Sequence, residues 1–197
     1  MNQPNLVLRQ IFVLALILTA SMAVTLRANF LDNSDFKEDM SSWHGDGSAA
    51  FLKPDGTEGD ESDPGVIPVI KLKTSPGETR LVYQEFETPD KPTTLHVKVD
   101  VFASADFKRS AHASDYTINW KAGGTWYWSA IAIPNVDFWI RGGGSSWFYK
   151  LANLKPGTWT TVDGRFEGLP EDQDRVVNFC IPCGEGTVYL KNPVVEP

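Results

Sequence analysis

The sequence predicts an all-β protein, a sandwich or barrel built from many short antiparallel strands. From Ala28 onward no stretch shows the apolar period of a long amphipathic helix. Short runs rich in β-branched and aromatic residues alternate instead with clusters of Gly, Pro, Asp, Asn and Ser, which is typical of strands separated by turns. The clearest run is Leu95–Ala103, in which apolar residues alternate with His96, Lys98 and Asp100. Because side chains alternate between the two faces of a strand, this run has one buried and one exposed face.

The other expected strands follow the same criteria of β-propensity, alternation and flanking turn residues. We expect strands at Asn29–Leu31, Ala49–Leu52, Val66–Lys73, Thr79–Glu87, Thr93–Ala103, Tyr116–Lys121, Thr125–Ile133, Asp137–Arg141, Trp147–Ala152, Trp159–Phe166, Arg175–Cys180 and Thr187–Val194. Strands at this spacing indicate a sandwich or barrel of antiparallel sheets.

Length and charge restrict the classes of function. The 197 residues, 42% of them hydrophobic, suffice for one well-buried domain and are few for two. No internal repeat and no linker-like stretch divides the chain, so we expect one domain over 29–197. The net charge of −7 argues against nucleic acid or an anionic membrane as partner, because both require a basic patch.

The N-terminal residues have the pattern of a signal peptide. Arg9 precedes an apolar run over Ile11–Leu18, and Ser21-Met22-Ala23 places small residues at the −3 and −1 positions of a cleavage site. We expect a signal peptide over 1–23, or over 1–28 if cleavage follows Ala28. The run is shorter than the roughly 20 residues that span a bilayer. An uncleaved anchor is the alternative. The mature chain is predicted to be secreted, periplasmic or on the cell surface, and free of the membrane.

The two cysteines, Cys180 and Cys183, form a C-x-x-C pair. In an exported chain this spacing fits a redox pair or half of a metal site. However, no second pair exists to complete a tetrahedral zinc site, and no βαβ pattern surrounds the motif. We therefore predict a local disulfide that joins Cys180 to Cys183.

Five of the seven tryptophans lie within 116–150, which reads as two hairpins. Gly123-Gly124 indicates a two-residue turn, which would pair Asn119 with Trp128 and Lys121 with Trp126. One face of this hairpin then carries apolar residues. The other face combines polar groups with two indoles, at Asn119, Lys121, Trp126 and Trp128. A one-residue slip would exchange the faces of one strand relative to the other, so this assignment depends on register.

The second hairpin adds further candidates for a ligand surface. Trp139 and Arg141 share one face of their strand, and Trp147 and Tyr149 share one face of theirs, on either side of the loop 142–146. Indoles stack on the apolar faces of sugar rings, and Asn, Lys and Arg hydrogen-bond the hydroxyls. Aromatic residues also fill the cores of sandwiches, so packing is the alternative role of each tryptophan.

Other chemistries have weaker signals. The acidic stretch Asp55–Pro64 lacks the spacing of an EF-hand and is expected to be a solvated loop, with calcium binding as the alternative. His44, His96 and His112 have no nearby nucleophile or H-x-x-H spacing. No G-x-S-x-G motif, phosphate loop or pair of catalytic carboxylates is present. We therefore expect no catalytic residues and no enzyme activity.

Three segments resemble carbohydrate-binding modules of the family 4/9 type, which have the galactose-binding-like jelly-roll fold. The first is Phe30–Phe36, followed by Trp43, which is similar to the opening of those modules. The second, Leu154–Val162 with Arg165-Phe166, resembles their late strand, and the third, Gly186–Val194, resembles their closing strand. The segments occur in the family's order and cover nearly the whole mature chain. The resemblance implies a jelly-roll β-sandwich of two antiparallel sheets. The same fold hosts many functions.

The resemblance also bears on metal binding and on two tryptophans. Many such modules carry an aspartate where Lys191 stands, and that acid often helps to hold a structural calcium. Lysine cannot ligate calcium, so Asp35 is the one remaining candidate ligand and we predict no cofactor. Trp43 and Trp159 stand at the family's structural positions and are expected in the core.

These observations together predict a secreted, non-catalytic protein that binds a poly- or oligosaccharide. The candidate binding residues are Asn119, Lys121, Trp126, Trp128, Trp139, Arg141, Trp147 and Tyr149. The alternatives are a structural or protein-interaction sandwich of the cell envelope and, with less support, a small polysaccharide-active enzyme. The glycan and the oligomeric state are left open.

Overall fold

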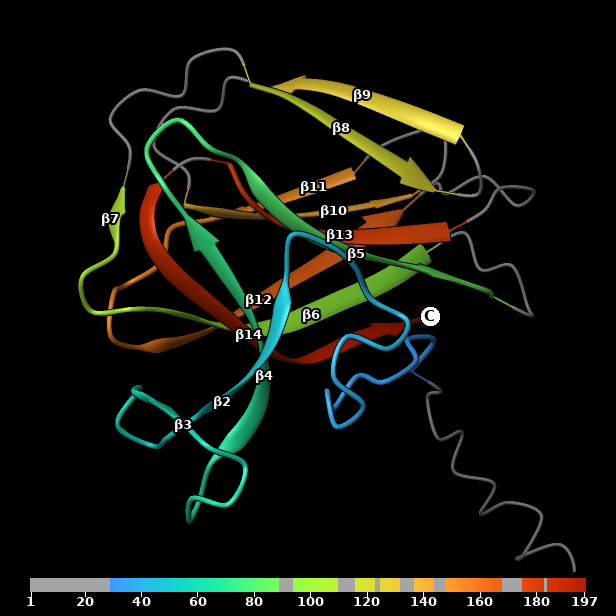
Figure 1. Cartoon of the computed structure of the whole chain (residues 1–197). Coiled ribbons are helices and arrows are strands. Elements are labelled where there is room, and N and C mark those ends of the chain that lie inside the picture. Colours follow the sequence, from blue (N-terminus) through green and yellow to red (C-terminus); the bar gives the residue numbers. More distant parts are fainter. Residues whose placement is uncertain are drawn as a thin grey trace, which may run out of the picture.

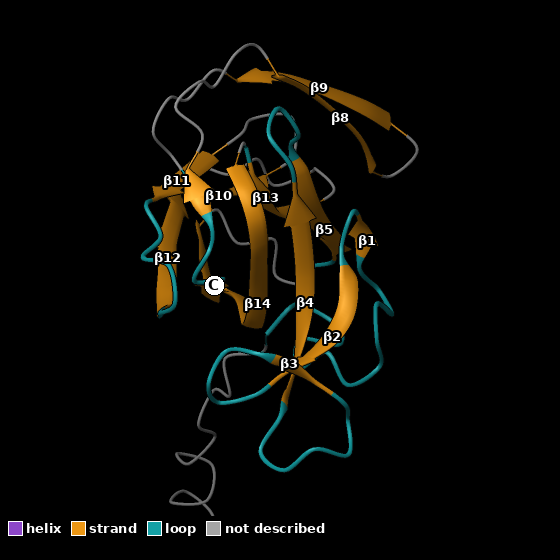
Figure 2. Cartoon of the chain, turned by 60° about the vertical axis from the view of Figure 1, so that its left-hand side comes forward, coloured by secondary structure: helices purple, strands orange, loops and turns teal. Residues whose placement is uncertain are grey.

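The computed structural model is an all-β structure, as the sequence predicts (Figure 2). It describes residues 29–88, 94–109, 116–122, 125–131, 137–143, 148–167, 175–182 and 184–197, and of residues 116–122, 125–131, 141–143, 148, 149 and 151 it describes the backbone. None of the described residues belongs to a helix that is long and apolar enough to cross a membrane.

Two antiparallel sheets form the body of the protein (Figure 1). The five-stranded sheet has, in spatial order, the strands β1 (His44–Gly45), β5 (Arg80–Phe86), β13 (Arg175–Ile181), β10 (Phe138–Gly143) and β11 (Phe148–Ala152). The seven-stranded sheet has the order β12 (Trp159–Glu167), β6 (Thr94–Ala103), β14 (Gly184–Glu196), β4 (Ile67–Thr74), β2 (Ser48–Leu52) and β3 (Glu58–Gly59), with β7 (Lys108–Arg109) paired to β14. Neighbouring strands in these orders are often far apart in the sequence, as in a sandwich with crossovers.

The main hydrophobic core lies between the two sheets. All five apolar residues predicted to face inward on β6, from Leu95 to Ala103, are at most 2% exposed. Across the core, Val177, Phe179 and Ile181 of β13 are at most 1% exposed. Full burial of each larger side chain contributes about 1.5–3 kcal/mol. Burial of the apolar residues of β6 and β13 therefore holds the two sheets together. The residues that alternate with them on these two strands lie on the outer faces.

A smaller apolar cluster covers the outer face of the seven-stranded sheet. Phe102 and Tyr189 are 7% and 5% exposed, and Trp159 packs against them. The loop after β2 lies on this cluster, because a Cβ built on Gly56 would come 2.5 Å from Phe102 Cζ. Glycine at that position, which has φ +85°, allows the backbone to approach the ring.

A third, two-stranded sheet consists of β8 (Tyr116–Ala122) and β9 (Thr125–Ile131), which pair only with each other among the described strands. Figures 1 and 2 both place this hairpin outside the five-stranded sheet, on the side away from the seven-stranded sheet. The predicted register is confirmed: Ala122 pairs with Thr125 and Asn119 with Trp128.

One predicted strand, Asn29–Leu31, is wrong. The segment makes a single backbone hydrogen bond to the closing strand, from Phe30 N–H to the Val195 carbonyl at 2.9 Å. The Asn29 side chain takes the adjacent positions, donating to the Pro193 carbonyl and accepting from the Val195 N–H, both at 2.9 Å. Since proline has no N–H to donate, a regular ladder cannot extend along this edge.

Candidate functional site

The outer face of the five-stranded sheet carries a row of residues that runs across all five strands. The register pairs His44 of β1 with Tyr83 of β5, and Tyr83 with Asn178 of β13. Asn178 is opposite Arg141 of β10, which is opposite Tyr149 of β11. We refer to these five residues as the transverse row. Four strand spacings of about 4.8 Å give it a length of about 19 Å.

The alternation of β13 places the row on the outer face. Val177 and Phe179 point into the core between the sheets, so Asn178, which lies between them, points outward. Residues directly opposite on neighbouring strands share a face, and the register therefore carries this assignment to the rest of the row. The row combines an amide, a guanidinium, an imidazole and two phenol rings. These groups are hydrogen-bonding side chains and ring faces suited to a polyhydroxylated ligand.

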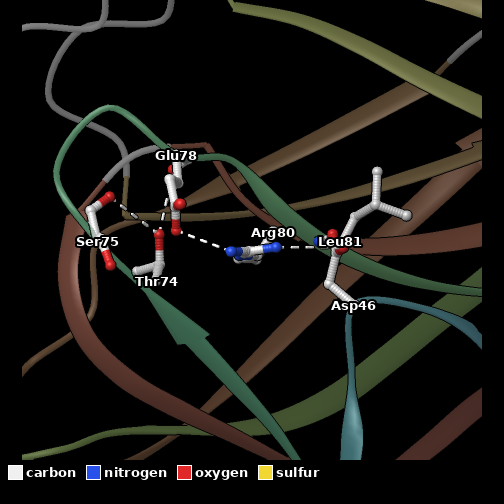
Figure 3. Close-up of polar contacts among 6 residues, drawn as sticks. All are labelled: Asp46, Thr74, Ser75, Glu78, Arg80 and Leu81. Carbon is white, nitrogen blue, oxygen red and sulfur yellow. Dashed lines mark hydrogen bonds and ion pairs between the residues drawn. The ribbon is translucent and has the colours of Figure 1, made fainter.

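Polar contacts fix β1, and with it His44, against β5 (Figure 3). Asp46 accepts the Leu81 N–H at 3.1 Å through its carboxylate and donates its own N–H to the Leu81 carbonyl at 2.8 Å. Arg80 lies between Glu78 at 2.8 Å and Asp46 at 3.4 Å. Glu78 raises the pKa of the guanidinium above its ordinary value. On the same pair of strands, the ring centroids of His44 and Tyr83 are 5.5 Å apart.

The loop before β1 also holds this edge of the sheet. Asn33 donates from its amide to the carbonyls of Asp39 and Ser41, each at 3.1 Å, and accepts the Glu38 N–H at 3.1 Å. The Asn33 carbonyl accepts the indole N–H of Trp43 at 3.3 Å. The loop has four non-glycine residues in the left-handed region, Asn33, Phe36, Asp39 and Ser42. Trp43 is 3% exposed, which confirms its predicted place in the core.

Asn178, at the centre of the row, is buried without a hydrogen-bond partner. Its side chain is 3% exposed, and among the described residues neither its amide nitrogen nor its amide oxygen has a hydrogen-bond partner. Its outer-face neighbours on the same strand, Val176 and Cys180, are 4% and 1% exposed. The outer face is therefore covered at β13, on the side where the β8–β9 hairpin lies.

For comparison, a second buried amide lies on the neighbouring strand β5. Gln84 of β5 is 2% exposed. Its oxygen accepts the Asp32 N–H at 2.8 Å, and its nitrogen donates to the Asp32 carbonyl at 3.0 Å. Buried polar groups are normally paired in this way, so an unpartnered amide on the outer face requires a specific reason. A ligand that supplies both a donor and an acceptor to Asn178 is such a reason.

The structure places some of the predicted binding residues and leaves others as predictions. Arg141 and Tyr149 lie in the transverse row. Trp139 lies on the same face, opposite Cys180, but is 1% exposed, so its ring is covered rather than presented for stacking. Trp147 lies outside the described residues. Asn119, Lys121, Trp126 and Trp128 have the predicted register in the hairpin, and their role in binding stays a prediction.

Sequence reasoning missed three members of the row, His44, Tyr83 and Asn178. No strand was predicted at His44, yet it begins the short edge strand β1. Asn178 had a usable signal, because it is a single amide in the apolar strand Arg175–Ile181. The pairing that aligns these residues with Arg141 joins strands distant in sequence, and local patterns do not contain it.

Cys180 is buried on the outer face, and among the described residues no disulfide joins it to another cysteine. Cys183 lies outside the described residues. The predicted bridge between the two therefore stays a prediction.

The other polar clusters have structural partners. His96 lies between Asp163 at 2.5 Å and Glu196 at 3.4 Å, and these contacts connect β12, β6 and β14. Glu58 was expected in a solvated loop but pairs with Lys71 at 2.6 Å and accepts the Tyr189 hydroxyl at 2.7 Å. Lys71 lowers the pKa of Glu58. Within the described part of the chain, no group of three or more His, Cys, Asp and Glu side chains is arranged to hold a metal.

Trp159, expected in the core, is instead partly buried on the outer face of the seven-stranded sheet, where it packs against the smaller apolar cluster. Its ring packs against Phe102, with centroids 5.4 Å apart, and the Lys191 ammonium lies 4.0 Å from the ring centroid. These contacts support the prediction that Trp159 packs rather than binds ligand. Lys191, the residue that departs from the calcium-binding pattern, thus has a cation–π contact with Trp159.

No protein-family model and no curated protein matches the sequence. Solved structures do share its fold. A family 16 carbohydrate-binding module matches with a TM-score of 0.52 and 13% identity, covering 86% of this chain and 100% of the module. TmCBM61, solved in complex with β-1,4-galactotriose, matches with a TM-score of 0.52 and 10% identity, covering 85% of this chain and 97% of that one.

An arabinose-bound α-L-arabinofuranosidase, MgGH51, also shares the fold over part of its length. It matches with a TM-score of 0.51 and 10% identity, covering 87% of this chain and 27% of the enzyme. At these identities the likeness establishes the fold alone. The two-sheet sandwich described above is a jelly roll of the kind found in carbohydrate-binding modules, as the sequence predicts.

Proposed function

We propose that this protein binds an oligo- or polysaccharide without catalysis, along the transverse row of the five-stranded sheet. The observation that carries the proposal is Asn178, a buried amide on the outer face that has neither a donor nor an acceptor as partner within the part of the chain that the structure describes. A sugar hydroxyl can donate and accept at once, so adjacent hydroxyls of a pyranose ring can satisfy both ends of the amide.

The neighbours of Asn178 suit the rest of a sugar ring. Tyr83 and His44 provide ring faces at one end of the row, and the backbone register places a second tyrosine, Tyr149, at the other end. Arg141, which the backbone register places opposite Asn178, is a residue type with several hydrogen-bond donors. The aromatic residues of the β8–β9 hairpin, Trp126 and Trp128, lie in a segment on the same side of the sheet and are the proposed stacking partners.

The composition of this face favours binding over glycoside hydrolysis. Hydrolysis by the common mechanisms requires two carboxylates that flank the scissile bond. The transverse row contains no carboxylate. Among the described outer-face residues of β5 and β13, Glu85 is the single acidic residue.

The proposal includes export and a single mature domain. The signal-peptide pattern in residues 1–23, or 1–28, supports secretion to the periplasm, the cell surface or the medium. The mature domain is then 29–197. A bridge between Cys180 and Cys183 would form in such an oxidising compartment, and counting free thiols in the native protein tests it.

A glycan array followed by calorimetric titration tests the function. We expect at least one class of oligosaccharide to bind, and Asn178→Ala to weaken that binding about tenfold or more, because two hydrogen bonds of about 0.5–1.5 kcal/mol each are lost. Asn192→Gly is the matched control. It removes an exposed amide from the other sheet at φ 49°, a conformation that glycine adopts freely. Unchanged binding by Asn178→Ala, or a silent array, contradicts the proposal.

A further inference from the structure

The β8–β9 hairpin lies outside the five-stranded sheet and, among the described strands, shares no backbone ladder with it. Within the described residues its two strands hydrogen-bond only to each other, whereas the remaining strands pair within the two large sheets or to β14. The hairpin nevertheless lies outside the five-stranded sheet in both views (Figures 1 and 2). An isolated two-stranded hairpin is marginally stable in water, and no other described strand pairs with this one.

The face beneath the hairpin is closed to ligand in this arrangement. Asn178, Cys180 and Trp139 are each at most 3% exposed, although none of them belongs to the core between the sheets. The amide nitrogen and oxygen of Asn178 are shielded from solvent as well as unpartnered. A ligand can therefore reach this amide only after the material that covers it has moved.

The same amide disfavours the closed arrangement. A buried polar group without a hydrogen-bond partner is costly, and the cost disappears when water or a ligand can reach it. Opening restores hydration to Asn178 but exposes apolar surface at Trp139 and Val176. The two effects therefore act on the opening equilibrium in opposite directions.

We propose that the β8–β9 hairpin is a movable cover of the transverse row, and that the unpartnered amide of Asn178 shifts the equilibrium toward its opening. Ligand enters through the open state, in which the amide is accessible. The inference rests on the proposed function only for the identity of that ligand as a sugar. The opening itself is a property of the unliganded chain.

Hydrogen exchange measured by mass spectrometry on the unliganded full chain tests the cover. We expect the amides of β8 and β9 to exchange together, faster than those of β13, and with less dependence on urea than global unfolding. Asn178→Leu removes the buried polar group and should slow exchange in the hairpin by about 5- to 30-fold. Asn192→Gly, on the other sheet, should leave it unchanged.

If Asn178→Leu does not fold, hydrogen exchange of the wild-type protein still tests the proposal by itself. The proposed cover is refuted if the hairpin amides exchange only with global unfolding. It is also refuted if the hairpin exchanges at the same rate in wild type and in Asn178→Leu. If the hairpin opens as expected while the glycan array is silent, the cover stands and the sugar assignment fails. If glycans bind through Asn178 while the hairpin does not open separately, the cover alone fails.

Discussion

Asn178→Leu is expected to stabilise the protein, and Gln84→Met to destabilise it, although both changes replace a buried amide by an apolar side chain of similar size. The two residues lie on neighbouring strands and are 3% and 2% exposed. Gln84 makes two hydrogen bonds to the backbone of Asp32, whereas Asn178 makes none. The pair therefore separates the effect of hydrogen bonding from the effect of burial.

The magnitudes follow from these contacts. Burial of an amide without a partner costs about 1–3 kcal/mol, so its removal should raise the free energy of unfolding by that amount. In a chain of this length each kcal/mol shifts Tm by about 2–4 °C. Gln84→Met loses two hydrogen bonds and should lower the free energy of unfolding by about 1–3 kcal/mol.

Urea denaturation followed by tryptophan fluorescence measures both changes, with thermal unfolding as a second reading. The slope of the free energy against urea should be the same in the three proteins, since the surface exposed on unfolding is nearly unchanged. A loss of stability of more than about 1 kcal/mol in Asn178→Leu would refute the reasoning. It would mean that ordered water satisfies the amide in solution, so that the face is hydrated rather than closed.

Three further changes test other parts of the fold. Gly56→Ala should lower the free energy of unfolding by about 1–3 kcal/mol in urea denaturation, because its Cβ would lie 2.5 Å from the enclosed ring of Phe102; no loss would contradict the packing. Asp137→Ala should lower the free energy of unfolding by about 1–3 kcal/mol in the same assay, because this 2%-exposed carboxylate accepts a buried backbone N–H. Full stability would show that another group accepts that N–H. Lys71 lowers the pKa of Glu58 below its ordinary 4.5, so their pair stabilises the fold above that pH. The stability difference between wild type and Glu58→Gln should shrink as pH falls through the folded pKa, and a difference that grows would contradict the pairing.

Much of the fold could be predicted from local patterns. The period of two in Leu95–Ala103 places each of its apolar residues in the core, and the observed burial agrees residue by residue. The glycine pair at 123 and 124 predicts the register of the first hairpin, because a two-residue turn allows one pairing. The strand predicted at Asn29–Leu31 is wrong because the Asn29 side chain and a proline interrupt pairing with the closing strand. Strand propensity takes neither effect into account.

The candidate site could be predicted only in part. Arg141 and Tyr149 were found from their positions in an aromatic hairpin, and they lie in the transverse row. Trp139 was found in the same way but is covered, because a strand pattern does not show what lies over a face. Asn178 shows in the sequence as one amide within an apolar strand. Its lack of a partner is visible only once the surrounding groups are placed.

The sequence by itself determined the all-β class, most strand positions and the inward face of each alternating strand. These properties depend on periodicity and turn chemistry over a few residues, so local sequence contains them. The tertiary structure alone decided which strands pair, because the neighbours of β13 come from positions about 40 and 95 residues away along the chain. That pairing aligns His44, Tyr83, Asn178, Arg141 and Tyr149 in one row. It also sets the amide of Asn178 beneath a covered face, where an unpartnered polar group is costly.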